Sequence, residues 1–238
     1  MLLTFLKIFN YIAPASLFYT FTGFGGVVQL GGVAEHCFNL VPGGANTAAQ
    51  GINGIMQAYN NAVQSVRLSG PTIFSQVLQT AIGISQSGMN GSQYFTLLII
   101  TDGVITDMEN TKNAIVAACD YPLSILIVGV GPADFSRMEE LDGDDEVLRA
   151  TNGRKASRDI VQFVAMRDFK GKAAQAFSSE LLAEIPAQLC GFMRSKHIVP
   201  KTQQPQMAVA NASSAGLPVA NVVVQVETKN QNPAYVSK

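Results

Sequence analysis

Two residues of this chain combine a side chain and a position suited to binding a divalent cation. Asp102 directly follows an unbroken apolar and β-branched run, Tyr94 to Thr101. Such a run predicts a strand buried on both faces of a parallel sheet, and open α/β sheets bind ligands beyond the carboxyl ends of their strands. Thr72 follows Gly70-Pro71 at the expected start of a helix. A carboxylate and a hydroxyl are oxygen ligands of the kind that Mg²⁺ and Ca²⁺ prefer.

Both residues also have ordinary structural explanations. Asp is favoured where a strand turns into a helix, because its side chain bonds to nearby backbone groups. Thr is a common helix cap for a similar reason. Two ligands alone do not make a metal site, so the residues themselves leave both interpretations open.

The other motifs argue against a conventional enzyme. The sequence contains no GxxxxGK[ST] phosphate loop, no GxSxG nucleophile elbow and no HExxH metal motif. Gly129-Val-Gly131 is not a dinucleotide fingerprint, because Asp134 stands where the third glycine belongs. The acidic loop at 141–146 lacks the ligand spacing of an EF-hand. Since no nucleophile, base and orienting group come together, we predict no catalytic residue and no organic cofactor.

Size and composition indicate one large α/β domain with a tail. The chain has 238 residues, 47% of them hydrophobic, and a formal net charge of −1, which argues against binding nucleic acid phosphates. Cys37, Cys119 and Cys190 lie far apart, which indicates reduced thiols of a cytosolic protein. The presence of only two histidines excludes a His-rich metal site.

The apolar patterns predict alternating strands and helices. A second continuous apolar run at 123–130 forms a βαβ unit with the strand at 94–101, through a helix at 107–119 that a capping box at Thr106–Glu109 opens. We expect these two strands to be parallel, adjacent and central. Further predicted elements are short strands at 36–40 and 159–164 and helices at 47–66, 71–87, 134–138 and 178–196, the last divided or kinked at Pro186.

Both termini differ from the middle of the chain. Residues 1–20 form an apolar lead-in, in which Lys7 fits no signal peptide and Asn10 and Pro14 interrupt any membrane-spanning run. Residues 200–238 are rich in Gln, Asn, Ala, Ser and Pro, which predicts a disordered tail, with Val222–Val226 as a candidate local strand. On this prediction, deleting 208–238 changes the thermal midpoint by only a few degrees.

From Phe21 to about Val199 the sequence resembles the copine domain, a branch of the von Willebrand factor A fold. The matching motifs occur in order: GFGG at 23–26, HCFNL at 36–40, GPT at 70–72, YFTLLIITDGVITD at 94–107, IVGVG at 127–131, ELDGDD at 140–145, RDIVQF at 158–163 and LAEIP at 182–186. The resemblance implies a Rossmann-like α/β domain of the A type at 21–199, with a mostly parallel central sheet flanked by helices.

The resemblance also implies where metal would bind. The A domain of the family binds a divalent cation at a metal-ion-dependent adhesion site, built from an Asp-x-Ser/Thr-x-Ser loop after the first strand, a threonine and an aspartate. By resemblance Thr72 is this threonine and Asp102 this aspartate. Residues 1–22 contain no Asp, so we expect the first strand to be missing or replaced and the site for Mg²⁺ or Ca²⁺ to be incomplete.

In function, the resemblance implies a protein-interaction module rather than an enzyme. The copine family binds phospholipid in a calcium-dependent way through two C2 domains, which this sequence does not contain, while its A domain recruits target proteins. The implied partners are therefore target proteins, with membrane phospholipid only through the absent C2 domains and no nucleic acid. The implied location is cytoplasmic, with plasma-membrane association. Two alternatives stay open: a ubiquitin-ligase-related A domain without its RING, and a truncated, non-functional fragment of a full-length copine.

Overall fold

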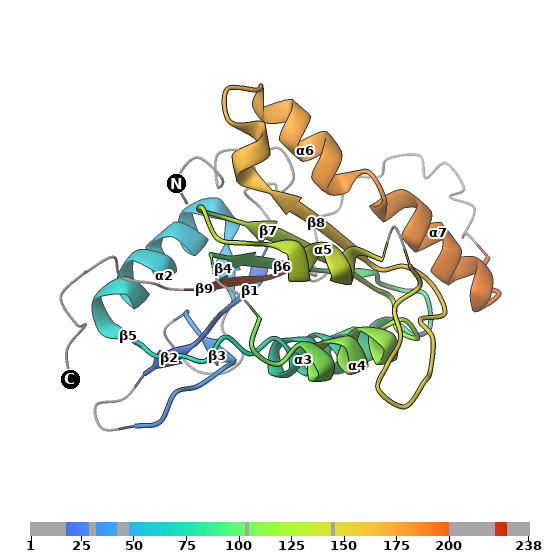
Figure 1. Ribbon diagram of the computed structural model, residues 1–238, viewed down its shortest axis with the longest axis horizontal. Coiled ribbons are helices and arrows are strands. Elements are labelled where there is room, and N and C mark those ends of the chain that lie inside the picture. The colour runs from blue at the N-terminus through green and yellow to red at the C-terminus, as the bar shows by residue number, and fades with distance from the viewer. Residues whose placement is uncertain are drawn as a thin grey trace, which may run out of the picture.

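The computed structural model describes residues 18–28, 32–41, 48–102, 105–143, 146–199 and 222–227 (Figure 1). The strands are β1 (Phe18–Phe24), β2 (Gly26–Val27), β3 (Phe38–Asn39), β4 (Ala49–Gln50), β5 (Arg67–Leu68), β6 (Phe95–Thr101), β7 (Leu123–Gly129), β8 (Val161–Ala165) and β9 (Val222–Glu227). The α-helices are α2 (Gly51–Ser65), α3 (Ser75–Ser85), α4 (Met108–Ala118), α5 (Ser136–Asp142), α6 (Ala174–Leu182) and α7 (Ile185–Ser195). Short 3₁₀ turns are η1 (Gln86–Gly88) and η2 (Met166–Phe169).

The main sheet is mostly parallel. Its strand order is β3-β1-β9-β6-β7-β8, with β4 paired to the start of β1; β2 and β5 form a separate small sheet. Strands β1, β9, β6, β7 and β8 are parallel to one another, whereas β3 and β4 run antiparallel to β1. The predicted Rossmann-like α/β fold is confirmed, and so is the parallel pairing of β6 with β7, which runs from Phe95 opposite Leu123 to Thr101 opposite Gly129.

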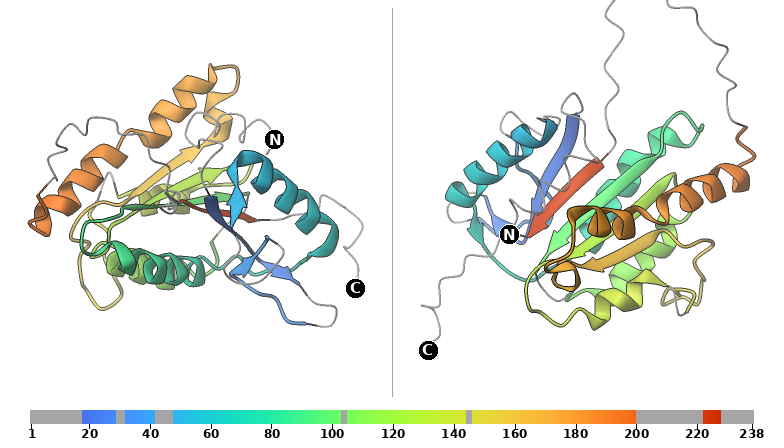
Figure 2. Two further views of the ribbon diagram at one scale, coloured as in Figure 1. Left: turned by 180° about the vertical axis from the view of Figure 1, so that it is seen from behind. Right: turned by 90° about the horizontal axis from the view of Figure 1, so that it is seen from above.

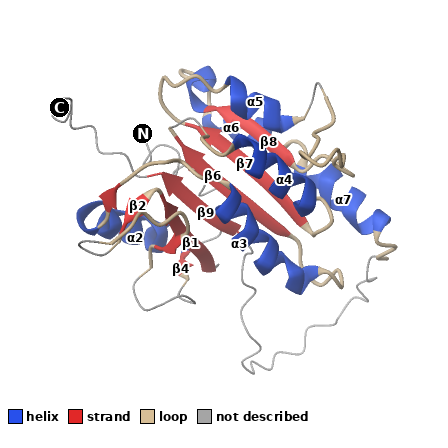
Figure 3. Ribbon diagram, turned by 60° about the horizontal axis from the view of Figure 1, so that its bottom comes forward, coloured by secondary structure: helices blue, strands red, loops and turns tan. Residues whose placement is uncertain are grey.

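Helices cover both faces of this sheet (Figure 3). Alternate residues of β6 enter two separate cores, which explains why its sequence is apolar without interruption. Leu97 and Ile99 pack with α3 and α4 on one face, while Leu98 and Ile100 pack with α2 and α6 on the other. Among the described helices, none has both the length and the apolar character needed to cross a bilayer.

Some element boundaries differ from those predicted. Helix α3 begins at Ser75 rather than at 71. The Asp107 carboxylate, from the loop after β6, accepts the backbone N–H groups of Phe74 and Ser75 and so fixes the first turn there. The helix predicted at 178–196 is two helices, α6 and α7, divided as expected next to Pro186, which lies in the first turn of α7. Helix α5 extends to Asp142, where Gly143 takes the left-handed conformation (φ 77°) that ends many helices.

A polar cluster holds the amino end of the sheet together. The Arg158 guanidinium donates to the carbonyl oxygens of Cys119, Tyr121 and Leu123 and lies over the Phe192 ring. One fork-shaped side chain therefore joins the turn between α4 and β7 to the last helix. Beside it, Ser124 of β7 donates to the Gln188 side chain of α7 at 2.6 Å, which anchors that helix on the sheet.

Strand β9 is the main departure from the sequence-based expectation. Residues 222–227 pair with β1 on one side and with β6 on the other, so for these six residues the expectation of a disordered tail is wrong, and the candidate strand forms. The remainder of the tail, 200–221 and 228–238, lies outside the described residues, as do residues 1–17 of the lead-in. In the order 3-2-1-4-5-6 of the Rossmann fold, β9 takes the place of strand 1 (Figure 2, right). Local composition missed this because the stabilising partners lie far away in sequence.

The position of β9 reverses the predicted effect of removing the tail. Deletion of 208–238 is now expected to lower the thermal midpoint by more than about 8 °C, because a central strand loses its pairing on both sides and 1 kcal/mol corresponds to about 2–4 °C at this size. Deletion of 228–238, which lies beyond β9, serves as the matched control and should leave the midpoint near that of the full chain. Differential scanning calorimetry of the three proteins measures both effects. Equal midpoints for the two deletions would contradict the role given to β9.

Candidate functional site

Thr72 and Asp102 lie in loops at the carboxyl edge of the sheet. Asp102 directly follows the last residue of β6, and two residues separate Thr72 from the start of α3 at Ser75. Thr72 is buried, with 8% of its surface exposed, and Asp102 is half-buried. Both therefore occupy the region where doubly wound sheets bind ligands, which is the position that the sequence predicts.

The loop after β6 is fastened to the loop that carries Thr72. The backbone N–H of Thr106 donates to the Thr72 carbonyl oxygen at 3.1 Å, and the Thr106 hydroxyl donates to the same oxygen at 2.6 Å. Two donors from one residue thus fix the backbone of Thr72. These protein contacts hold the two loops that carry the predicted ligand residues against each other.

Asp107 stabilises the same junction from the other side. Its carboxylate accepts the backbone N–H groups of Phe74 and Ser75, each at 3.0 Å, and the Thr111 hydroxyl at 3.2 Å. These two N–H groups belong to the first turn of α3, which has no acidic residue of its own. The capping box predicted for α4 is therefore wrong: α4 begins at Met108, and Asp107 makes no side-chain cap bond within its own helix but supplies the cap of α3.

The surroundings of Asp102 include Tyr59, which lies in the helix predicted at 47–66. Burial raises the pKa of Tyr59 in α2, and the negative charge of Asp102 raises this pKa further. The phenol and the carboxylate therefore lie within electrostatic range of each other. On the neighbouring side, a Cβ added to Gly131 would lie 3.9 Å from the Asp102 Cβ, so the turn after β7 passes close to the carboxylate. In the sequence, the only indication that Tyr59 could serve a site is its hydroxyl group, which stands among aliphatic residues in the helix predicted at 47–66.

The described residues at this edge do not fit a complete cation site. Mg²⁺ requires about six oxygen ligands in near-octahedral geometry, and Ca²⁺ requires six to eight. Asp102 and Thr72 supply two side-chain oxygens in all. Within the described ranges, no three His, Cys, Asp or Glu side chains gather closely enough to hold a metal ion. The arrangement offers one carboxylate, one hydroxyl and one phenol on a rigid base.

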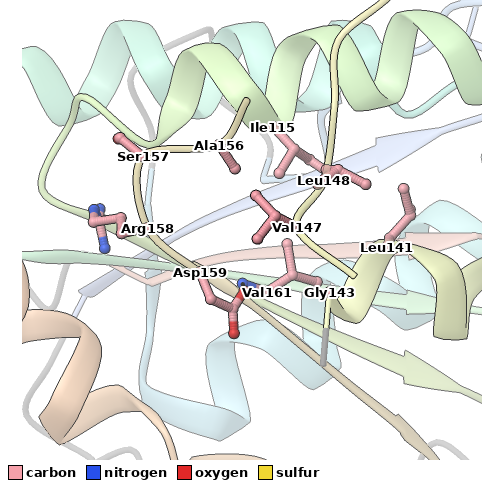
Figure 4. A pocket seen from close by; sticks show the side chains of 10 residues that line it. All are labelled: Ile115, Leu141, Gly143, Val147, Leu148, Ala156, Ser157, Arg158, Asp159 and Val161. Carbon is pink, nitrogen blue, oxygen red and sulfur yellow. Dashed lines mark hydrogen bonds between the residues drawn. The ribbon is translucent and has the colours of Figure 1, made fainter. Parts of the chain in front are cut away.

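A separate cavity of about 180 Å³ lies at the opposite end of the sheet, beside the start of β8 (Figure 4). Its lining is largely aliphatic and comes from α4, α5 and the segment between α5 and β8. The two charged residues on its wall have structural partners: Arg158 donates to backbone carbonyl oxygens, and the Asp159 carboxylate accepts the Val161 N–H. The two charged side chains of this wall are thus engaged in structural contacts, and we assign the candidate site to the carboxyl edge.

Similarity to known proteins covers most of the chain. The family model described as Copine matches residues 4–201. The chain is 49% identical over 174 residues to Protein BONZAI 2 and 50% identical over 169 residues to Protein BONZAI 1, both from Arabidopsis thaliana. These matches cover 72% and 70% of this chain. They cover only 30% and 29% of the two relatives, so the chain corresponds to less than a third of their length.

The contact of Asp107 with α3 generates a stability prediction. Asp107→Ala leaves the Phe74 and Ser75 N–H groups without their acceptor, which is expected to cost about 1–3 kcal/mol of unfolding free energy. Glu109→Ala is the matched control, because Glu109 is an exposed acid in the first turn of α4. Urea unfolding of the two variants and the unaltered chain measures the difference. A loss in Glu109→Ala as large as that in Asp107→Ala would contradict the cap.

Proposed function

Because this chain belongs to the copine family, we propose that it is a protein-interaction module whose carboxyl edge, around Thr72 and Asp102, binds target proteins. The observation that supports this proposal is the fixed geometry of the edge. Thr106 and Asp107 join its loops through four hydrogen bonds between protein groups. A surface organised before binding loses little conformational entropy when a partner docks.

We propose that the module is not an enzyme. The side chains at the edge are a carboxylate, a hydroxyl and a tyrosine, whose phenol is protonated at neutral pH even at its ordinary pKa. This set lacks the nucleophile, base and orienting group that acyl or phosphoryl transfer requires. It does suit recognition, since Asp102 can accept hydrogen bonds from a partner's Arg or Lys and Tyr59 adds an amphipathic ring.

We propose the cytoplasm as the compartment of this domain. Cys37, Cys119 and Cys190 are all free thiols, as the sequence predicts, and the last of them is exposed. A reducing compartment keeps such thiols from pairing. Calcium-dependent phospholipid binding and plasma-membrane association belong to the family through C2 domains, and our proposal assigns neither to residues of this chain.

Partner capture with edge variants tests the proposed function. The chain is used as bait in a cell extract, with Asp102→Ala as the edge variant and Asp120→Ala as the control. Asp120 is a half-exposed acid at the opposite end of the sheet, paired with Arg154. Proteins captured by the unaltered chain should fall at least about tenfold with Asp102→Ala, a loss typical of one interfacial charge pair, and remain with Asp120→Ala. Equal capture by both variants would show that partners bind away from the carboxyl edge and would refute this proposal.

The same edge leads to a prediction about cations. The chain is expected to bind Mg²⁺ or Ca²⁺ weakly, in the millimolar range or above, because Asp102 and Thr72 leave most of the coordination shell to water. Isothermal titration with each cation, on the unaltered chain and on Asp102→Ala, measures this affinity. Sub-millimolar binding that disappears in Asp102→Ala would show that further residues complete the site and would refute the prediction.

A further inference from the structure

Among the described residues, the main sheet consists of two groups of strands that are joined only by pairing with β9. In the described part of the chain, β1 pairs with β3, β4 and β9, whereas β6 pairs with β7 and β9. No pairing joins β1 directly to β6 within these ranges. A single six-residue segment thus bridges the two groups, as Figure 2 shows in its right-hand view.

Pairing with β9 is extensive on both sides. Five residues of β9 have register partners in β1, from Thr20 opposite Val223 to Phe24 opposite Glu227. Five have partners in β6, from Thr96 opposite Val222 to Ile100 opposite Val226. Without β9, both strands would present unpaired backbone N–H and C=O groups toward each other inside the molecule, which is costly.

The side chains that flank the position of β9, between β1 and β6, are apolar on both faces of the sheet. Phe21 of β1 and Leu98 of β6 belong to the core beneath α2, and both have no exposed surface. Phe24 of β1 and Leu97 of β6 belong to the core beneath α3 and α4, and both are also fully buried. A strand placed between β1 and β6 therefore lies between two hydrophobic layers, an environment that favours β-branched side chains.

The segment that occupies the position has a sequence of this kind. Residues 222–227 read Val-Val-Val-Gln-Val-Glu, with four β-branched residues and one charge, which stands at the carboxyl end. The described chain before it ends at Val199, so 22 residues, 200–221, separate the two. A connection of this length raises the local concentration of the segment to roughly the millimolar range. The pairing of β9 therefore resembles the binding of a tethered peptide.

We propose that the gap between β1 and β6 is a strand-binding site, of which Val222–Glu227 is the tethered ligand. Its ligand in trans is an extended segment of a partner with the same chemistry: six residues, mostly β-branched, without charge before the carboxyl end, running parallel to β1 and β6. Such a segment adds main-chain hydrogen bonds on both sides, as in proteins that insert a loop into an existing sheet. This inference concerns the interior of the sheet, so it stands or falls independently of the proposed function of the carboxyl edge.

Displacement of the tethered strand tests this site in the full chain. Val224 is the register partner of both Phe21 and Leu98, so Val224→Pro weakens β9 at its centre, because proline cannot donate to the ladder. A fluorescent peptide with the sequence of residues 219–230 should bind the Val224→Pro chain one to one and raise its thermal midpoint. The unaltered chain should bind the peptide at least tenfold more weakly, since its own segment competes.

A peptide of residues 219–230 that carries the same proline is the matched control and should neither bind nor stabilise. The proposal is overturned if the unmodified peptide neither binds a folded Val224→Pro chain nor raises its thermal midpoint. It is also overturned if both peptides bind and stabilise that chain equally. Circular dichroism of the variant decides whether it is folded.

A covalent test covers the case in which Val224→Pro does not fold. Thr22 and Gln225 are register partners. A Thr22→Cys chain, with exposed Cys190 replaced by serine, should therefore react with a 219–230 peptide that carries cysteine at 225 as its 2-thiopyridyl disulfide. The chain thiol displaces 2-thiopyridone and forms a mixed disulfide with the peptide. A peptide with cysteine at 223, which is the register partner of Thr20, should react at least tenfold more slowly. Mass spectrometry identifies the linked residue. Equal rates for the two peptides would refute exchange at this site.

Discussion

The pairing of β9 with β1 and β6 is the interaction on which the rest of the sheet depends. Each core is built from residues of both strand groups: Phe24 lies with Leu97, and Phe21 lies with Leu98. These side chains lie over one continuous surface only if the two groups keep the spacing of three adjacent strands, about 4.8 Å at each pairing. Hydrophobic packing on both faces and the ladders of β9 therefore stabilise the same arrangement.

The carboxyl edge follows from this arrangement. Parallel strands end at one edge, so the loop after β6 and the turn after β7 lie side by side there, with Gly131 next to Asp102. The loop before α3 comes from a different part of the chain and is brought to the edge by Thr106 and Asp107. The positions of Asp102 and Thr72 are thus set by the fold and by neutral or capping hydrogen bonds, whether or not a cation is present.

The central features of this protein could be predicted from the sequence where the signal was local. The apolar runs at 94–101 and 123–130 predicted parallel, buried, neighbouring strands, because a strand covered on both faces needs no polar alternation. Asp102 was predicted at the edge of the sheet because it follows such a run directly. The free state of the three cysteines followed from their spacing.

Features that depend on distant contacts could not be predicted in this way. The position of β9 depends on partners in β1 and β6, and a short valine cluster in a polar region carries no information about them. Asp107 precedes α4 in the sequence and was therefore assigned to that helix, yet its carboxylate caps α3, 33 positions away in sequence from Phe74. Tyr59 fits the apolar spacing of α2, and only the folded structure brings it near Asp102.

The place of β9 in the chain also has a consequence for the order of events during synthesis. Its partners in β1 are made about 200 residues before it and those in β6 more than 120 residues before it, so its pairings are among the most non-local in the domain. On the ribosome, β1 and β6 emerge long before the strand that separates them. Two strand edges then stay unpaired through much of translation, a condition that favours association with other nascent chains.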